Sequence, residues 1–171
     1  MDFKGPYHYT LRIQGKKGER NIQDKLDAQR NIVSFTSPVT LNKRAKIYIL
    51  KDKESIIYIG YTSQSIANRL RYGINPKGAK GYSGYKWKGL DEIELLLFVF
   101  DKELIGDKNE EDKKIISFVE SVEAELVYLV RSKTGKWPKN QNEIHFNNFE
   151  IEKAKQVAEK IYKEIEIHEM V

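Results

Sequence analysis

Apolar and polar side chains alternate along parts of the first hundred residues at the two-residue period of β-strands. Residues 7–13 (YHYTLRI) predict a half-buried strand, with tyrosine, leucine and isoleucine on one side and histidine, threonine and arginine on the other. Residues 46–51 (KIYILK) and 55–60 (SIIYIG) are rich in isoleucine and tyrosine and are separated only by DKE, so they predict a β-hairpin. Residues 93–100 (IELLLFVF) form an apolar run, which predicts a central strand that is buried on both faces.

Apolar residues at helical spacing dominate the later part of the chain. Residues 114–132 carry isoleucine, phenylalanine, valine and leucine three to four positions apart, which predicts a buried helix. Residues 150–168 have the apolar stripe of an amphipathic helix. A shorter helix is predicted directly after the hairpin, over residues 63–72 (SQSIANRLRY), with Ser63 or Ser65 as its N-cap. Residues 21–32 have a weaker period and predict one more short helix.

These elements predict an α/β fold with a small, mostly antiparallel three-stranded sheet flanked by helices. Pro38 disfavours helix in the residue before it, so TSPV separates the start of the chain from the main unit. We therefore expect an N-terminal arm over residues 1–43 and a central domain over 44–142. Residues 143–171 are expected to form a C-terminal helical extension packed on the same domain.

Composition narrows the chemistry that this fold can carry. A chain of 171 residues is long enough for one domain with a real core. The absence of cysteine excludes disulfides, thiolate metal sites and cysteine nucleophiles, and three histidines make a histidine-rich zinc centre a poor fit. No apolar run approaches the roughly 20 residues of a membrane span, and no signal-peptide pattern opens the chain. We expect a cytoplasmic protein with no membrane partner.

Charge is distributed unevenly along the chain, although the net charge of +5 is modest. Residues 61–90 hold six basic side chains and no acidic one, and residues 127–142 hold four basic side chains and no acidic one. Between them, residues 91–126 hold twelve acidic and four basic side chains. Such a pattern is typical of a polyanion-binding face on a protein whose other surfaces are acidic. Solvated charge without a partner is the alternative interpretation.

One ordered set of residues lies on the hairpin and on two of the predicted helices. The hairpin carries KIY at 46–48 and YIG at 58–60, the helix after it carries Arg69, and the segment VEAELVYLV carries Glu123. This set resembles the GIY-YIG nuclease superfamily over residues 44–142. The YIG tripeptide matches as it stands, whereas lysine occupies the usual place of the glycine in GIY. The two tyrosines are separated by nine residues, one or two fewer than is usual.

The resemblance implies a role for each member of the set in cleaving a phosphodiester. Arg69 would bind the phosphate, since a guanidinium keeps its charge and forks onto phosphate oxygens. Glu123 would hold one divalent cation, Mg²⁺ or Mn²⁺, together with the substrate phosphate. Tyr58 would act as general base for the attacking water, and Tyr48 would position the water or the base. Because the ordinary tyrosine pKa is about 10, Tyr58 would need nearby positive charge to lower it.

Two of these assignments have a competing residue. The family's arginine often lies ten residues after the second tyrosine, which here is Asn68, and Arg71 is the substitute candidate for Arg69. Glu120 shares the helical side of Glu123 and is the alternative metal ligand.

Three further positions follow from the same resemblance. Gly60 and Asn142 are expected to have supporting roles. Tyr61 stands where some relatives carry a catalytic lysine, so a lysine role at that position is excluded.

Lysines and aromatic rings are interleaved on two predicted loops, KGAKGYSGYKWKG (77–89) and RSKTGKWPK (131–139). Lysines can follow phosphates and aromatic rings can stack on bases, whereas tryptophans that fill the edge of the core are the alternative. The residues expected to contact nucleic acid are Arg71, Tyr72, Lys77, Lys80, Lys86, Trp87, Lys88 and Lys136.

The resemblance therefore implies a metal-dependent endonuclease that hydrolyses DNA, with RNA as the alternative substrate. A catalytically silent nucleic-acid-binding module of the same fold would keep the basic loops without needing Glu123. A protein-interaction unit built on the arm and the last helix would leave the tyrosine–arginine–glutamate set unexplained. Restriction, mobile-element cleavage and repair stay open as biological settings.

Overall fold

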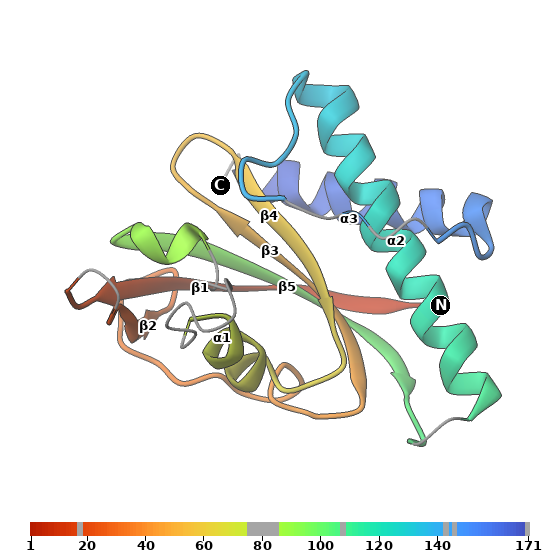
Figure 1. The fold of residues 1–171 in the computed structure, drawn as a ribbon, viewed down its shortest axis with the longest axis horizontal. Helices are drawn as coiled ribbons and strands as arrows, with labels where there is room; N and C mark the ends of the chain where they lie inside the picture. Colours follow the sequence, from red (N-terminus) through yellow and green to blue (C-terminus); the bar gives the residue numbers. More distant parts are fainter. Residues whose placement is uncertain (17–18, 75–85, 107–108, 142–143, 145–146, 170–171) are drawn as a thin grey trace.

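The structure of the chain, a computed structural model, describes residues 1–16, 19–74, 86–106, 109–141, 144 and 147–169. Within them a single antiparallel sheet has the strand order β2-β1-β5-β3-β4 (Figure 1). The expected α/β class is confirmed, but the expected number of three strands is wrong, because the N-terminal residues add two strands to the sheet. The strands are β1 Phe3–Gln14, β2 Asn21–Leu26, β3 Arg44–Lys51, β4 Ile56–Thr62 and β5 Glu92–Glu103.

Strand β5 lies in the middle of the sheet, between β1 and β3. Leu96 and Phe98 belong to the core on one face, and Leu95 and Leu97 belong to the core on the other. All four are fully buried, so the prediction of a strand buried on both faces is confirmed. A sheet that is apolar on both faces needs cover on both sides.

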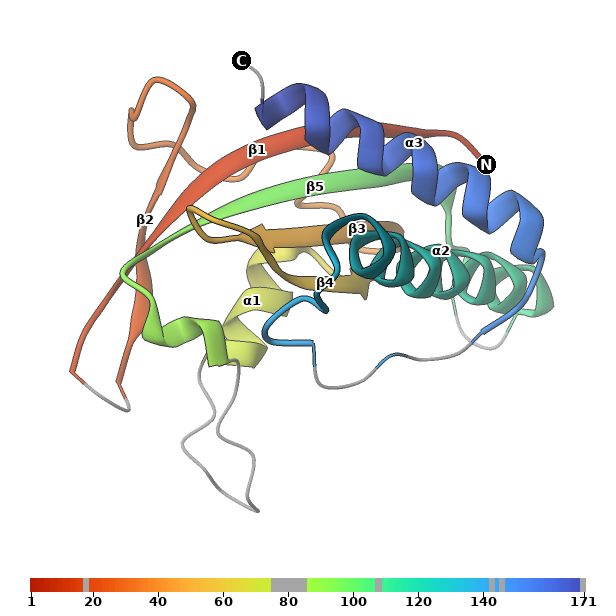
Figure 2. The ribbon, with the colours of Figure 1, turned by 90° about the horizontal axis from the view of Figure 1, so that it is seen from above.

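Helices supply that cover (Figure 2). The helices are α1 Ile66–Ile74, the short 3₁₀ helix η2 Lys86–Gly89, α2 Glu110–Thr134 and α3 Ile151–Glu169. Helices α2 and α3 pack on one face of the sheet, and α1 and η2 pack on the other. The helices predicted over 63–72, 114–132 and 150–168 are therefore confirmed. None of the helices in the described part of the chain has the length and apolarity that crossing a membrane requires.

The N-terminal residues are part of the sheet. The predicted strand over residues 7–13 is confirmed, and it pairs along β5 with Tyr9 opposite Leu95. The short helix predicted over residues 21–32 is wrong, because residues 21–26 form β2 and pair with β1. Only Leu26 of β2 is fully buried. A helix over these residues would bury little apolar surface, whereas a strand here forms backbone hydrogen bonds with β1.

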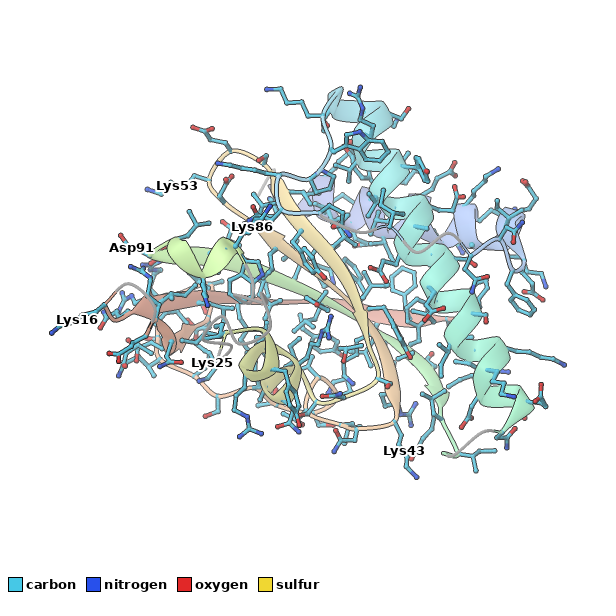
Figure 3. The ribbon with its side chains drawn as sticks, viewed as in Figure 1. Lys16, Lys25, Lys43, Lys53, Lys86 and Asp91 are labelled. Atoms are coloured by element: carbon cyan, nitrogen blue, oxygen red, sulfur yellow. The ribbon has the colours of Figure 1, made fainter. Side chains whose placement is uncertain are left out.

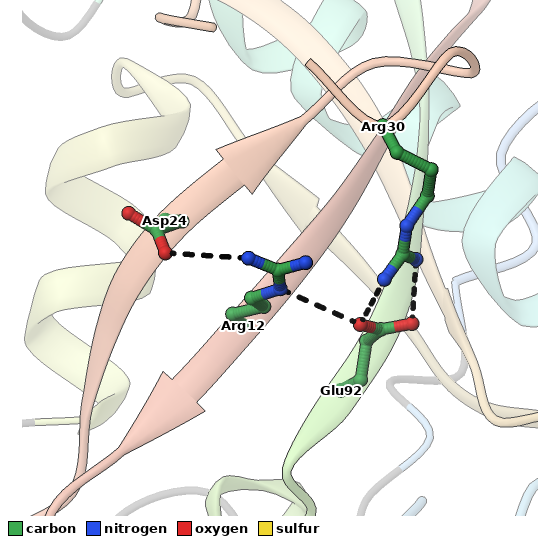
Figure 4. Close-up of polar contacts among 4 residues, drawn as sticks. All are labelled: Arg12, Asp24, Arg30 and Glu92. Atoms are coloured by element: carbon green, nitrogen blue, oxygen red, sulfur yellow. Dashed lines mark hydrogen bonds and ion pairs between the residues drawn. The ribbon is translucent and has the colours of Figure 1, made fainter. Parts of the chain in front are cut away.

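Ion pairs connect these first strands to the start of β5 (Figure 4). Arg30 donates from its two terminal nitrogens to the carboxylate of Glu92, at 2.7 and 2.8 Å. Arg12 lies 3.8 Å from both Glu92 and Asp24. Hydrogen bonds from Arg30 lower the pKa of Glu92, as expected for a carboxylate held in a bidentate pair. The network joins β1, β2 and the turn after β2 to β5.

Candidate active site

Strand β4 is an outer strand of the sheet, so its outward backbone groups need partners from outside the ladder. The N–H of Asn140 donates to the carbonyl of Ile57 at 2.8 Å. The N–H of Ile59 donates to Oε1 of Gln141 at 3.1 Å. The N–H of Tyr61 donates to a carboxylate of α2, that of Glu123. The outer edge of β4 is therefore where the hairpin meets both α2 and the segment that follows it.

The two motif tyrosines lie against each other beside Gly60. Their ring centroids are 5.7 Å apart with an interplanar angle of 36°. Gly60 is the cross-strand partner of Tyr48. A Cβ at position 60 would lie 2.6 Å from Cζ and from the hydroxyl oxygen of Tyr48, and 2.7 Å from Cε1 of Tyr58. Any side chain at this position would displace the tyrosine pair, which gives the expected supporting role of Gly60 a steric basis.

Helix α1 directs Arg69 toward the tyrosine pair. Oγ of Ser65 accepts the N–H of Asn68 at 3.3 Å, which makes Ser65 the cap of this helix. Nε of Arg69 donates to the hydroxyl of Tyr48 at 3.0 Å, and the guanidinium carbon lies 5.8 Å from the ring centroid of Tyr48. The competing Arg71 is exposed and donates to Oδ1 of Asn68 at 2.7 Å. The geometry favours Arg69 as the arginine of the site.

Glu123 brings a carboxylate of α2 to the same edge. Its charge interacts with Arg69 and with the hydroxyl of Tyr58. Burial, and next the charge of Glu120, raise the pKa of Glu123 to about 7, whereas Arg69 and the N–H of Tyr61 act in the opposite direction. Glu120 instead accepts a hydrogen bond from Nδ2 of Asn147 at 3.4 Å. These contacts favour Glu123 over Glu120 as the carboxylate that faces the tyrosines.

The environment of Tyr58 opposes its ionisation. Burial raises the pKa of Tyr58 above its ordinary value, and the charge of Glu123 acts in the same direction. Hydrogen bonds with Tyr48 and Arg69, together with the charge of Arg69, lower the pKa but do not cancel the effect of burial. The lowered pKa that a base would need, and that the sequence led us to expect, is therefore not found. Because the pKa is raised, the hydroxyl of Tyr58 in this arrangement is protonated at neutral pH.

The carboxylates on α2 have the chemistry that a hard divalent cation needs. Glu123 and Glu120 lie three positions apart on one helix, and the repulsion between them and the burial of Glu123 both favour a bound positive charge. Among the residues that the structure describes, no three His, Cys, Asp or Glu side chains gather into one cluster. The donors present therefore fit a cation held by one or two carboxylates, with substrate oxygens completing its coordination.

Most of the residues expected to contact nucleic acid are accessible where the structure describes them. Arg71, Tyr72, Lys86 and Lys136 are exposed, Tyr72 to 66%. Lys88 is half-buried. Lys77, Lys80 and Asn142 lie outside the described residues.

Trp87 is a correction. Its side chain is only 1% exposed and packs in the core between the sheet and α1, so it is not available to stack on a base. Trp137 is 47% exposed, and its ring lies edge-on to Tyr128 at 5.4 Å and 5.9 Å from the guanidinium carbon of Arg131. The alternative interpretation, a tryptophan that fills the edge of the core, therefore holds for Trp87.

Lys46 lies in the site region, and we noted it in the sequence without assigning it a role. Its side chain is fully buried, and its Nζ donates to the carbonyls of Leu41, Arg44 and Gln64 at 2.6, 2.7 and 3.0 Å. Burial lowers the pKa of Lys46 to about 8. Because Gln64 lies in the turn between β4 and α1, this lysine ties the start of β3 to the entry of the helix that carries Arg69. A lysine at the glycine position of the motif was the available signal.

Gln141 is a second residue that the sequence did not single out. It supplies the Oε1 that receives the Ile59 N–H, one position before the predicted Asn142. A segment after WPK that closes against the hairpin could not be distinguished by sequence from an ordinary loop.

Comparison with known proteins gives one match. Residues 44–114 match the family model described as the GIY-YIG catalytic domain, which confirms the resemblance that the motifs indicated. The matched segment contains the hairpin, α1 and β5, and Glu123 lies nine positions beyond its end. No curated protein and no solved structure matches the chain.

Proposed function

Because residues 44–114 match the family model of the GIY-YIG catalytic domain, we propose that the chain is a metal-dependent endonuclease that hydrolyses phosphodiester bonds in DNA. The observation that carries this proposal is that Tyr48 contacts both Tyr58 and Arg69, and that the charge of Glu123 acts on Tyr58 and Arg69 as well. An anion-binding guanidinium and a carboxylate able to hold a cation can stabilise the charge that develops when a phosphodiester is hydrolysed, and hydroxyls can position the attacking water.

Arg69 binds and orients the scissile phosphate. Its Nε is engaged by the hydroxyl of Tyr48, which fixes the plane of the guanidinium. The terminal nitrogens of a guanidinium fork onto two phosphate oxygens, and its charge stabilises the extra negative charge that develops on them. Tyr48 is thus a positioning residue for Arg69, buried and held by the strand pair of the hairpin.

Glu123 would hold the divalent cation, with Glu120 as a further carboxylate nearby. When bound, such a cation polarises the phosphate and supports the leaving oxygen. A hydrogen bond from the backbone of Tyr61 lowers the pKa of this carboxylate and connects it to β4. Removal of the cation should therefore stop hydrolysis without unfolding the edge of the sheet.

Tyr58 exchanges the proton with the attacking water. Its hydroxyl is hydrogen-bonded with Tyr48 and Arg69, and the charge of Glu123 raises its pKa. Neutralising Glu123 would remove one of the two causes that keep this pKa high and leave Arg69 as the charge acting on the hydroxyl. Burial, the larger of the two causes, would still hold the pKa of Tyr58 up, so neutralising the carboxylate favours loss of the hydroxyl proton without by itself ionising Tyr58 at neutral pH.

The test is cleavage of supercoiled plasmid and of single-stranded DNA by the purified chain. We expect nicked and linear products with Mg²⁺ or Mn²⁺ and none with excess chelator. A chain that binds DNA but does not cut it with either metal would favour the catalytically silent module. Single-stranded and duplex RNA of the same sequence serve as the comparison that decides between DNA and RNA.

A further inference from the structure

A cleft lies between the N-terminal strands and α1, on the side of the sheet that α1 covers. Its volume is about 480 Å³. Lys25 and Ile22 come from β2, Phe35 comes from the segment after it, and the facing wall is α1. Lys25 is labelled beside α1 in Figure 3. Since β2 lies before residue 44, one wall of this cleft is built by residues outside the matched catalytic domain.

Helix α1 presents different faces to the cleft and to the candidate active site. Ala67, Leu70, Arg71 and Ile74 line the cleft, and their three- and four-residue spacing places them on one stripe of the helix. Arg69 lies two positions from Arg71, about 200° around the helix, and contacts Tyr48. The same short helix therefore connects the cleft to the proposed phosphate-binding arginine.

The floor of the cleft is apolar and partly aromatic. Leu70 and Ile74 are buried at its base, and Phe35 and Ile22 are half-buried at its sides. The ring of Phe35 is held edge-on against Tyr9, with centroids 4.8 Å apart. A cleft of this volume with an immobilised aromatic ring suits a flat apolar group such as a nucleobase.

The charges at the cleft are positive. Lys25 and Arg71 both line it, and none of its described lining residues is acidic. Nζ of Lys25 lies over the Phe35 ring, 5.6 Å from its centroid, in a cation–π contact. Two cations next to an apolar floor complement a group that is apolar at one end and anionic at the other.

We propose that this cleft binds one unpaired nucleotide of a DNA strand, with its base against Phe35 and its phosphate between Lys25 and Arg71. A base inside a duplex is stacked on both faces and cannot enter such a cleft, so the occupant is an unpaired or extruded base. The proposal rests on the proposed function only in taking DNA as the substrate. The proposal adds a second contact with the DNA strand. This contact is made in part by β2 and lies on the other side of α1 from Arg69.

The first test uses a mononucleotide, which reaches the cleft without any cleavage. Deoxyadenosine monophosphate is titrated into the ¹⁵N-labelled chain, with inorganic phosphate and deoxyadenosine as separate probes. We expect saturable amide shifts at Ile22, Phe35, Leu70 and Ile74 with the nucleotide, and weaker binding of either fragment. Shifts confined to the residues around Arg69, or no saturable shift at all, would overturn the proposal.

The second test measures binding of a fluorescent single-stranded oligonucleotide in the presence of chelator. The double variant Lys25→Gln/Arg71→Gln should bind at least tenfold more weakly. The slope of log affinity against log salt should become shallower by about 0.7, since one neutralised phosphate on a single strand contributes about that much. Phe35→Leu should weaken binding at least fivefold, because stacking on an aromatic ring is lost.

The matched control removes the same charge elsewhere. Lys53 lies in the hairpin turn and Lys160 on α3, and both are exposed. Lys53→Gln/Lys160→Gln should change affinity less than threefold, and an equal loss in both double variants would overturn the proposal. These measurements detect binding alone. A wild-type chain that fails to cut DNA would contradict the proposed nuclease, but it would not affect the test of nucleotide binding in the cleft.

Discussion

Nε of Arg69 donates to the hydroxyl of Tyr48 across 3.0 Å, which joins the first motif tyrosine to the helix that follows the hairpin. The contact crosses from β3 to α1, and the tyrosine that accepts it is completely buried. The guanidinium is therefore oriented by a rigid partner before any substrate arrives. Pre-organised positive charge of this kind stabilises charge that develops in a transition state.

Replacement of Arg69 by lysine tests that orientation. Lysine keeps the charge but has neither the Nε donor nor the planar fork, so Arg69→Lys should lower the cleavage rate about 100-fold or more. The control is Arg30→Lys, at an exposed arginine that pairs with Glu92. Rates are measured on plasmid DNA under single-turnover conditions. Equal cleavage by Arg69→Lys and wild type would contradict the assigned role.

A methyl group at position 60 should disrupt the tyrosine pair. The new Cβ would lie 2.6 Å from the hydroxyl oxygen of Tyr48, closer than packed atoms approach. Gly60→Ala should lower the free energy of unfolding by about 1–3 kcal/mol, measured by urea denaturation, and should also reduce cleavage. Gly89→Ala is the matched control, because a Cβ there meets nothing within 4 Å. A fully stable Gly60→Ala variant would show that the pair moves freely.

The buried lysine at the start of β3 should be a stabilising residue. Lys46→Met leaves the carbonyls of Leu41, Arg44 and Gln64 without their donor, which should cost about 2 kcal/mol or more of unfolding free energy. The control Lys43→Met removes an exposed lysine with one carbonyl contact, to Ile105, and should cost less than about 1 kcal/mol. Equal stabilities of the two variants would contradict the role of Lys46.

The raised pKa of Glu123 predicts a pH-dependent cost in stability. With chelator present, the folded chain has a Glu123 pKa of about 7, above the ordinary 4.5 expected when unfolded. Between these values the folded chain binds a proton that the unfolded chain does not, so stability falls as pH rises from 4.5 to 7. Glu123→Gln should therefore be more stable than wild type at pH 8, by about 2 kcal/mol.

The same comparison at pH 4 should show no such advantage, because the carboxylate is then protonated in both states. Urea denaturation of the two proteins across this pH range is the measurement. A stability difference that stays constant from pH 4 to pH 8 would show that Glu123 ionises normally.

Sequence periodicity located most elements but not all of their partners. The hairpin, α1, β5, α2 and α3 each carry a strong local pattern and lie where we expected them. The pattern of residues 7–13 identified a strand and its buried side, but its partner is β5, more than eighty positions away. Alternation specifies which face of a strand is buried and says nothing about which strand lies beside it. The sheet was therefore predicted with two strands too few.

The candidate site was predictable where the motif and the geometry coincide. Tyr48, Tyr58 and Arg69 follow each other on one hairpin and one helix, so their order in sequence nearly fixes their meeting. The burial of Trp87 and the pKa of Tyr58 were not predictable, because both depend on how tightly distant elements pack. Burial outweighs the positive charge beside Tyr58, which no count of neighbouring charges in the sequence reveals.

Paired substitutions on α2 test most directly whether the carboxylate at the edge of β4 serves hydrolysis. Glu123 and Glu125 lie two positions apart and point to different sides of the helix, so Glu123→Gln and Glu125→Gln remove the same charge from different places. Each protein is assayed for Mg²⁺-dependent plasmid cleavage, and for DNA affinity in chelator. We predict that Glu123→Gln cuts about 1,000-fold more slowly or not at all and binds DNA within about threefold of wild type, while Glu125→Gln cuts normally. Cleavage by Glu123→Gln at the wild-type rate would contradict the account.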